Sequence, residues 1–243
     1  LLNAVRKLDQ KCNVVAITTD KVYENFEADY HYKESDRLGG YDPYSNSKAC
    51  TELVCASFRS SFFNPAKFKA HGKCIATARS GNVIGGGDWS EDRIIPDLMR
   101  ALENDERLWI RSPQSIRPWQ HLLDPLCGYL LLGARMNEDP VTFAEAYNFG
   151  PEEDDTLTVK ELVTKAIKIW GSGDFDIEKE NNAPHEAGLL QLSIEKAKND
   201  LGWFPRLNSV ETLEWTVEWY KMANSDAAGI TFKQVSDYLK LLT

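Results

Sequence analysis

The chain of 243 residues lacks the features of a membrane or secreted protein. No apolar run approaches the roughly 18 residues that a membrane span needs. The longest such run, Tyr129-Leu130-Leu131-Leu132, lies within an amphipathic helical pattern. No positively charged segment is followed by an apolar one in the order of a secretory signal. We therefore expect a cytoplasmic protein that has no membrane partner.

Clustered positive charge and paired cysteines are absent as well. With 28 Lys and Arg against 37 Asp and Glu, the net charge of -9 argues against a general nucleic-acid surface. No cysteine belongs to a CxxC pair or stands at zinc-ligand spacing from a histidine, so the sequence predicts no metal site. Buried free thiols in a reducing compartment are expected for all five: Cys12, Cys50, Cys55, Cys74 and Cys127.

The glycine fingerprint that opens a dinucleotide-binding domain is also missing. The chain begins with the tail of an amphipathic helix at residues 1–10. The run Gly85-Gly86-Gly87 lacks both the P-loop lysine and the dinucleotide spacing, so we interpret it as a turn that allows close backbone approach to a substrate. We expect an N-terminally truncated fragment in which the adenosine and pyrophosphate site lies in the absent part.

Strand patterns alternate with helix patterns in what is present. Apolar runs predict strands at 13–18, 73–79, 108–110, 146–149 and 175–179. Periodic segments predict helices at 43–63, 92–104, 124–136, 157–170, 194–201, 209–223 and 231–241. This alternation predicts an α/β fold with a parallel sheet.

Two polar motifs stand at one end of that predicted sheet. Thr19-Asp20-Lys21 follows the first strand, and Tyr44 and Lys48 lie four residues apart on the next helix, on one face. A phenol beside an ammonium is suited to take a proton from an alcohol while a hydride leaves the same carbon. The pair alone is weak, because about 0.6 such pairs arise by chance in this composition. A packed tyrosine and a solvated lysine would explain it equally well.

Longer motifs give the chain a resemblance to the extended short-chain dehydrogenase/reductase family. Five stretches occur in the family's order: YDPYSNSK at 41–48, ARSGNVIGGGDW at 78–89, RPWQH at 117–121, YNFGP at 147–151 and PHEA at 184–187. Epimerases of the family carry small hydroxyl residues where Asp20-Lys21 stands, and other sugar-nucleotide 4,6-dehydratases carry Asp-Glu. The family's CDP-glucose 4,6-dehydratases carry Asp-Lys, as this chain does.

The resemblance implies NAD-dependent dehydration of CDP-D-glucose to CDP-4-dehydro-6-deoxy-D-glucose, as in deoxysugar and lipopolysaccharide O-antigen biosynthesis. Tyr44 would deprotonate the sugar 4-hydroxyl as the hydride leaves C4, and Thr19 would donate to the same oxygen. Lys48 would hydrogen-bond the ribose of NAD. Asp20 would protonate the departing C6 hydroxyl. Lys21 would act as the base at C5 or would stabilise the enolate electrostatically.

Binding residues follow from the same resemblance. Arg79 and Ser80 are expected beside the nicotinamide half of NAD, together with Tyr44 and Lys48. Arg93 and Arg117 are the predicted diphosphate ligands, because a guanidinium offers paired donors to phosphate. The remaining predicted substrate contacts are Asn82 at the sugar or its phosphate, Arg111 near the base and His185 near the entrance.

The resemblance also assigns the parts of the chain. Residues 1–80 would be the C-terminal half of an NAD-binding, Rossmann-like, doubly wound parallel sheet. Residues 81–243 would mainly form a smaller mixed α/β lobe for the nucleotide sugar, with segments near 119–150 returning to the sheet. We expect a homodimer through the Tyr44 helix, unless that helix face packs only on its own sheet. Two alternatives stay open: another nucleotide-sugar 4,6-dehydratase or epimerase, and an inactive fragment without the cofactor half.

Overall fold

The computed structural model describes residues 1–177 and 189–243, and it confirms the predicted α/β fold with parallel strands. The chain divides into two compact units. Unit 1 comprises Leu1–Gly81, Pro125–Gly150 and Gln191–Phe204. Unit 2 comprises Asn82–Asp124, Pro151–Leu190 and Pro205–Thr243. The sequence analysis did not anticipate that Gln191–Phe204 joins unit 1. The assignment of cofactor and nucleotide sugar to separate parts stays a prediction.

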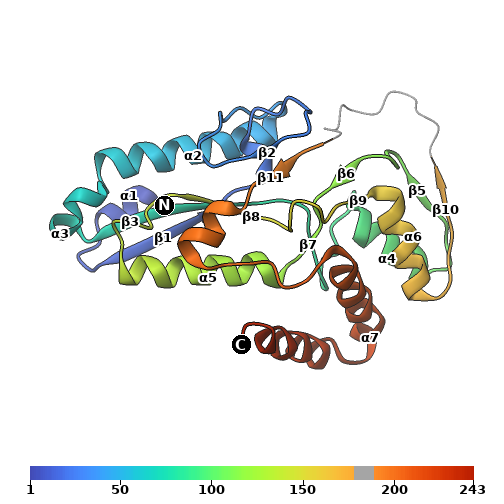
Figure 1. The fold of residues 1–243 in the computed structure, drawn as a ribbon. Helices are drawn as coiled ribbons and strands as arrows, with labels where there is room; N and C mark the ends of the chain where they lie inside the picture. Colours follow the sequence, from blue (N-terminus) through green and yellow to red (C-terminus); the bar gives the residue numbers. More distant parts are fainter. Residues whose placement is uncertain (178–188) are drawn as a thin grey trace. The chain divides into compact units, whose positions relative to one another are not determined.

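A parallel sheet in the order β1-β3-β8 forms the centre of unit 1. Its strands are β1 (Cys12–Ile17), β3 (Lys73–Ser80) and β8 (Ala146–Phe149). All eight residues of β3 are buried, as expected of a central strand that is covered on both faces. The covering helices α2 (Pro43–Ser61) and α5 (Leu123–Glu138) lie on opposite sides of this sheet (Figure 1).

Alternation along β3 divides its side chains between two apolar clusters. Cys74, Ala76 and Ala78 pack in one cluster with Leu132 and Met136 of α5. Ile75 packs in the other with Cys55 of α2, Val5 and Phe63. Because successive side chains of a strand point to opposite faces, Thr77 and Arg79 share the face of Ile75 and are directed toward α2.

Shorter elements complete unit 1. They are α1 (Leu2–Arg6), η1 (Asp20–Val22), β2 (His31–Tyr32), η2 (Pro65–Lys67), α3 (Phe68–His71), β11 (Gln191–Leu192) and the π-helical turn η3 (Ala197–Leu201). β11 pairs in parallel with β2, and this pairing brings a segment from late in the chain into unit 1.

Unit 2 combines three helices with short strand pairs. The helices are α4 (Ile94–Glu103), α6 (Val159–Trp170) and α7 (Ser209–Lys240). The strands are β4 (Val83–Ile84), β5 (Leu108–Ile110), β6 (Ile116–Arg117), β7 (Gln120–His121), β9 (Leu157–Thr158) and β10 (Phe175–Ile177). β4 pairs with β7 and β10 with β5 in parallel, whereas β6 and β9 are antiparallel.

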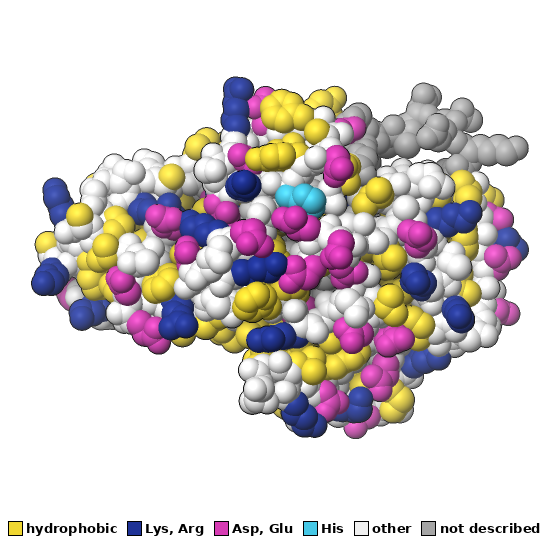
Figure 2. All heavy atoms as spheres, viewed as in Figure 1, with side chains coloured by type: hydrophobic (Ala, Val, Ile, Leu, Met, Phe, Trp, Pro, Cys, Tyr) yellow, Lys and Arg dark blue, Asp and Glu magenta, His cyan; other side chains and the backbone are white. Residues whose placement is uncertain are grey.

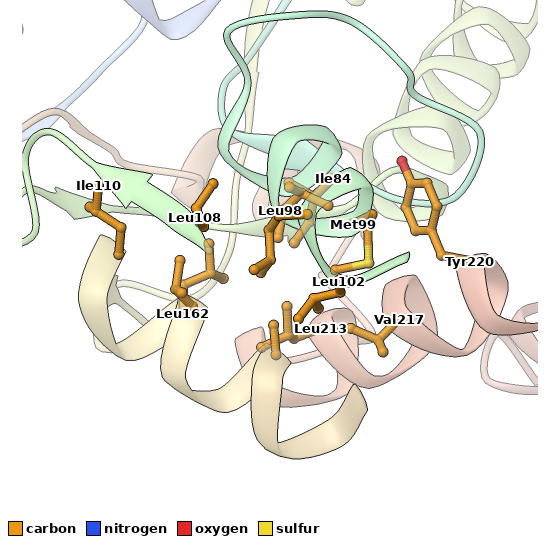
Figure 3. Packing of buried hydrophobic residues seen from close by; sticks show 14 of the residues in the cluster. Ile84, Leu98, Met99, Leu102, Leu108, Ile110, Leu162, Leu213, Val217 and Tyr220 are labelled. Atoms are coloured by element: carbon orange, nitrogen blue, oxygen red, sulfur yellow. The ribbon is translucent and has the colours of Figure 1, made fainter. Parts of the chain in front are cut away.

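One apolar core holds unit 2 together (Figure 3). Leu98, Met99 and Leu102 of α4 meet Leu162 of α6 and Leu213 of α7 in this core. Helices α6 and α7 each begin with a capping box, formed by a polar N-cap residue and a glutamate three residues later. Because these caps fix where each helix begins, the observed starts of both helices lie close to the predicted ones.

Helix α7 contains a kink. Asp226 has φ -156° and ψ 76°, which is not helical, and the helix continues on either side of it. This break lies between the two helices predicted at 209–223 and 231–241. Those two helices therefore form one kinked element.

The surroundings of the glycine run and of the cysteines add to the sequence interpretations. A side chain at Gly85 would meet Leu122 at 2.0 Å, and one at Gly86 would meet the Trp219 ring at 2.0 Å. These glycines therefore make room for the packing of unit 2 itself, and the close approach of their backbone to a substrate stays a prediction. No disulfide joins the five cysteines within the described residues; Cys55 and Cys74 are buried as expected, whereas Cys12 and Cys127 are half-buried and Cys50 is exposed.

Charges of both signs are interspersed on the face drawn in Figure 2. The net charge of -9 is therefore not gathered into one patch on that face. None of the helices in the described ranges is long and apolar enough to cross a membrane. Among the same residues, no group of three or more His, Cys, Asp and Glu side chains could hold a metal ion.

His121 makes the stability of unit 2 dependent on pH. Its side chain is 1% exposed, Nδ1 accepts a hydrogen bond from the Leu123 N–H at 3.3 Å, and its ring lies edge-on to Trp215. Burial lowers the pKa of His121 from 6.5 to about 4. The unfolded chain therefore binds a proton as pH falls below 6.5, while the folded chain does not bind it until about pH 4. The stabilisation that comes from keeping His121 neutral is therefore fully present above pH 6.5 and is lost as the pH falls from 6.5 to about 4.

We predict that His121→Phe, which keeps a ring against Trp215, removes this pH dependence. Between pH 7.5 and pH 5 the wild-type protein should lose about 2 kcal/mol of unfolding free energy through this group. Urea denaturation at the two pH values measures the loss. Parallel losses in the variant and the wild-type protein would show that His121 is not responsible.

Candidate active site

The start of α2 presents Tyr44 and Lys48. Asp42 caps the helix by accepting from the Ser45 N–H at 3.0 Å, and Pro43 occupies the first turn, where its missing N–H is harmless. Hydrogen bonds from Ser45 hold the pKa of Asp42 below its ordinary value. Tyr44 is 54% exposed, and Lys48 Nζ lies 5.9 Å from the centre of its ring. The two side chains share one face of the helix, as their spacing predicted.

The end of β1 carries the second motif. Thr18 and Thr19 continue from the strand, and Asp20–Val22 form the short turn η1, which packs against α2. The Thr19 hydroxyl donates to Asp20 Oδ1 at 2.8 Å. Because a hydroxyl has one proton, the structure gives that proton to Asp20, and the predicted donation to a substrate stays a prediction. The Lys21 side chain is exposed.

A buried glutamate fixes the position of α2 relative to the sheet. Glu52 lies one turn after Lys48 and is 3% exposed. It accepts from the Thr18 hydroxyl at 2.6 Å and from the Thr77 hydroxyl at 2.7 Å. Arg79 Nε and Nη2 donate to its two oxygens at 3.0 and 2.9 Å. Glu52 thereby ties the helix of Tyr44 to both strand ends.

Arg79 belongs to this supporting network. The sequence analysis placed it beside the cofactor, but its side chain is 3% exposed, and Nη1 donates to the Tyr23 hydroxyl at 2.8 Å. Tyr23 in turn donates to Asn148 of β8 at 2.7 Å. Burial opposes both charges of the Arg79–Glu52 pair, but their mutual hydrogen bonds and attraction outweigh it. The pKa of Arg79 is therefore raised and that of Glu52 lowered, so both groups are ionised.

Asp20 is bonded much less completely than Glu52. It is 1% exposed, yet its Oδ2 has no hydrogen-bond partner among the described residues. An unpaired buried acceptor costs about 1–3 kcal/mol, so such atoms are rare in native proteins. This oxygen is therefore available to another donor.

Ser80 and the predicted residues of unit 2 have these positions. The Ser80 hydroxyl meets the Tyr129 hydroxyl. Asn82 adopts φ +50°, a left-handed conformation that asparagine tolerates better than most residues. Arg93 is the exposed N-cap residue of α4. Arg111 is exposed near Asp92, with Nη2 3.8 Å from its carboxylate, and Arg117 is 9% exposed on β6. His185 lies outside the described residues.

Sequence reasoning missed Thr18 and Glu52. The available signal was the spacing of Tyr44, Lys48 and Glu52, which recur every four residues and therefore share one face of α2. A glutamate on a helix is usually solvated, so the sequence gave no reason to pair it with Arg79.

A cavity of about 420 Å³ in unit 2 does not suit a diphosphate. Four carboxylates line it against a single arginine, and like charges repel an anion. Its lining consists of Glu152, Asp154, Asp155, Pro205, Arg206, Leu207, Asn208 and Glu211.

Known proteins are similar to this chain in sequence and in fold. The family model of GDP-mannose 4,6 dehydratase matches residues 1–216. The chain belongs to that family. It is 45% identical over 245 residues to the CDP-glucose 4,6-dehydratase of Salmonella typhimurium, covering 100% of this chain and 68% of that protein. The dTDP-D-glucose 4,6-dehydratase of Mus musculus is 26% identical over 85% of this chain.

Solved structures agree on the fold. UDP-glucuronic acid 4-epimerase from Bacillus cereus, solved with NAD, has a TM-score of 0.74 at 20% identity, over 91% of this chain and 65% of that one. The dTDP-glucose 4,6-dehydratase from Bacillus anthracis, also solved with NAD, has a TM-score of 0.70 over 89% and 64%. The chain thus spans about two thirds of these proteins and 55% of the mouse relative. The predicted membership of the nucleotide-sugar dehydratases is confirmed.

We predict that Glu52→Gln destabilises the protein by about 3 kcal/mol, because it leaves the buried Arg79 charge without a counter-ion. Urea denaturation measures the change. Glu103→Gln on α4, which alters an exposed residue in the same chemical way, should change the stability by less than about 0.5 kcal/mol. Equal effects of the two substitutions would contradict the role of the pair.

Proposed function

We propose that the protein containing this chain converts CDP-D-glucose to CDP-4-dehydro-6-deoxy-D-glucose with NAD as cofactor. The observation that carries the proposal is the packing of α2, the helix of Tyr44 and Lys48, against η1, the turn that contains Asp20 and Lys21. The choice of nucleotide is supported by 45% identity to a CDP-glucose enzyme, against 24–28% to the dTDP- and UDP-sugar relatives and the Haloferax volcanii glycan protein.

The residues present fit the nicotinamide end of the cofactor. Tyr44 is half exposed with an ammonium beside it, at the carboxyl end of a parallel sheet, where α/β proteins bind nucleotides. Lys48 would hold the ribose hydroxyls. When bound, NAD supplies the two-electron acceptor that takes the hydride from C4 and returns it to C6. Arg79 would act indirectly, by fixing α2 on the sheet, because its guanidinium donates to Glu52 and Tyr23.

Tyr44 and Lys48 would act on the first step. The phenolate form of Tyr44 would take the proton of the sugar 4-hydroxyl and become a phenol, and the neighbouring Lys48 ammonium would favour the phenolate before the transfer. The resulting 4-ketone acidifies the hydrogen at C5. The Thr19 hydroxyl donates to Asp20. We propose that it turns to donate to the sugar 4-oxygen instead when substrate is bound.

Asp20 and Lys21 would act on the elimination. Lys21 removes the C5 proton or stabilises the negative charge that its removal leaves. Asp20 gives a proton to the departing C6 hydroxyl, which leaves as water. We assign this transfer to Oδ2, since Oδ1 is bonded to Thr19.

Unit 2 would bind the nucleotide part of the substrate. Arg93 is exposed at a helix start, where the dipole and free N–H groups favour anions. Arg117 is buried on β6 and would give a guanidinium little exposed to water. We propose these two residues as diphosphate ligands, Asn82 as a sugar contact, and Arg111 and His185 at the periphery.

The proposal also includes a homodimer through α2. Leu53 and Val54 are 58% and 50% exposed on this helix, next to one another, and burying them would be favourable. Sedimentation velocity of the complete protein tests this part, and a monomer at micromolar concentration would contradict it.

The reaction is tested by incubating the complete protein with NAD and CDP-, dTDP-, UDP- or GDP-sugars. NMR should detect a 4-keto-6-deoxy product from CDP-glucose. Consumption of another nucleotide sugar with CDP-glucose left intact would transfer the assignment to a different dehydratase. C4 inversion without loss of water would indicate an epimerase, and no reaction with any substrate would indicate an inactive protein.

Substitutions of Lys21 separate its two possible roles. We predict that Lys21→Ala still forms reduced cofactor, seen as absorbance at about 340 nm, but loses C5 deuterium exchange and product by about 100-fold or more. Lys21→Arg keeps the charge but cannot act as a base. Retained exchange in the Arg variant identifies charge stabilisation, and lost exchange identifies the base. Wild-type turnover of Lys21→Ala would refute either role.

A further inference from the structure

Gly81 stands where β3 ends, directly against the carboxylate of Asp20. A Cβ atom at Gly81 would lie 1.9 Å from Asp20 Oδ2, 2.1 Å from Cγ and 2.5 Å from Oδ1. Real Cβ atoms essentially never approach another atom within 3.0 Å. The carboxylate therefore occupies the space that any side chain at position 81 would need.

The backbone at Gly81 does not itself require glycine. Its φ angle lies outside the left-handed region, whereas Gly72, Gly87, Gly171, Gly173 and Gly202 have positive φ. A left-handed backbone therefore does not exclude alanine at this position. Glycine is thus required at position 81 for a steric reason: a larger residue would clash with Asp20.

Asp20 has little freedom to yield that space. It is 1% exposed, and its Oδ1 is held by the Thr19 hydroxyl at 2.8 Å. The closest of its atoms to position 81 is Oδ2, the oxygen without a hydrogen-bond partner among the described residues. A side chain at position 81 would displace the one carboxylate oxygen that is left for a substrate.

We infer that Gly81 is a positioning residue that keeps the Asp20 carboxylate in the orientation needed for elimination of water. This inference rests on the proposed dehydratase function. The C6–O bond breaks with its electron pair on oxygen, and the proton from Asp20 completes the departing water molecule. Hydride transfer at C4 depends on Tyr44 and Lys48 of α2 and does not use this space.

The inference predicts that Gly81→Ala separates oxidation from dehydration. Reduced cofactor and C5 deuterium exchange should appear in a single turnover, while formation of the 4-keto-6-deoxy product falls by about 100-fold or more. Gly133→Ala on α5 is the matched control, because a Cβ there meets nothing within 4 Å. Product formation by Gly81→Ala within twofold of this control overturns the inference.

A double-mutant cycle in thermal stability tests the contact without using activity. Gly81→Ala should lower Tm by about 4 °C or more when Asp20 is present. In the Asp20→Ala background the carboxylate is gone, and the same substitution should leave Tm unchanged or raise it. An equal loss in both backgrounds means that Gly81 does not act through Asp20, which overturns the inference.

The two experiments also separate this inference from the proposed function. If the wild-type protein does not dehydrate CDP-glucose but the stability cycle shows coupling, the proposed reaction fails and the steric pairing of positions 20 and 81 stands. If the wild-type protein does dehydrate CDP-glucose but the cycle shows no coupling, the reaction stands and the inference fails.

Discussion

The buried ion pair of Glu52 and Arg79 is the interaction on which unit 1 depends. Glu52 comes from α2 and Arg79 from β3, and the Thr18 hydroxyl joins the end of β1 to the same carboxylate. Two buried charges are costly unless their geometry and hydrogen bonds are nearly complete, so alternative positions of α2 on the sheet are penalised heavily. The pair therefore contributes more to a unique arrangement than to net stability.

This arrangement separates a frame from the groups that it presents. The frame is buried and hydrogen-bonded, and it continues through Tyr23 to Asn148 on β8. The groups at its edge are Tyr44, exposed at the start of α2, and Lys21, exposed on η1. A reactive side chain must be accessible, and a positioning side chain must not move. The Thr18–Glu52 hydrogen bond links the buried frame to the exposed groups, because Thr18 directly precedes Thr19 and Glu52 lies one helical turn after Lys48.

Patterns local in sequence predicted most of the elements and the two motifs. Apolar runs gave the strands, and periodicity with caps gave the helices. Contacts distant in sequence were not predictable. Glu52 and Arg79 each resemble solvated surface residues in the sequence, where they are 27 positions apart, and only the fold brings them together. Gly81 resembles an ordinary turn glycine because its reason, the Asp20 carboxylate, lies 61 positions earlier. For the same reason nothing indicated that Gln191–Phe204 would join unit 1, since its strand β11 is only two residues long and pairs with β2.

Two buried carboxylates only 32 positions apart are hydrogen-bonded in opposite ways, and this contrast supports the proposal that Asp20 is the acid. Glu52 accepts hydrogen bonds from Thr18, Thr77 and two nitrogens of Arg79, so each of its oxygens is occupied and it is held in the ionised form. A carboxylate in that state has no oxygen free to exchange a proton. The Asp20 carboxylate accepts from the Thr19 hydroxyl through Oδ1, and its Oδ2, which has no partner among the described residues, lies in the space beside Gly81. An acceptor left unpaired in a buried position destabilises the fold, and folds tolerate such a penalty mainly where function uses the atom. The incomplete bonding of Asp20 is therefore the feature expected of the acid in the elimination, and the complete bonding of Glu52 is what keeps Tyr44 and Lys48 in place beside it.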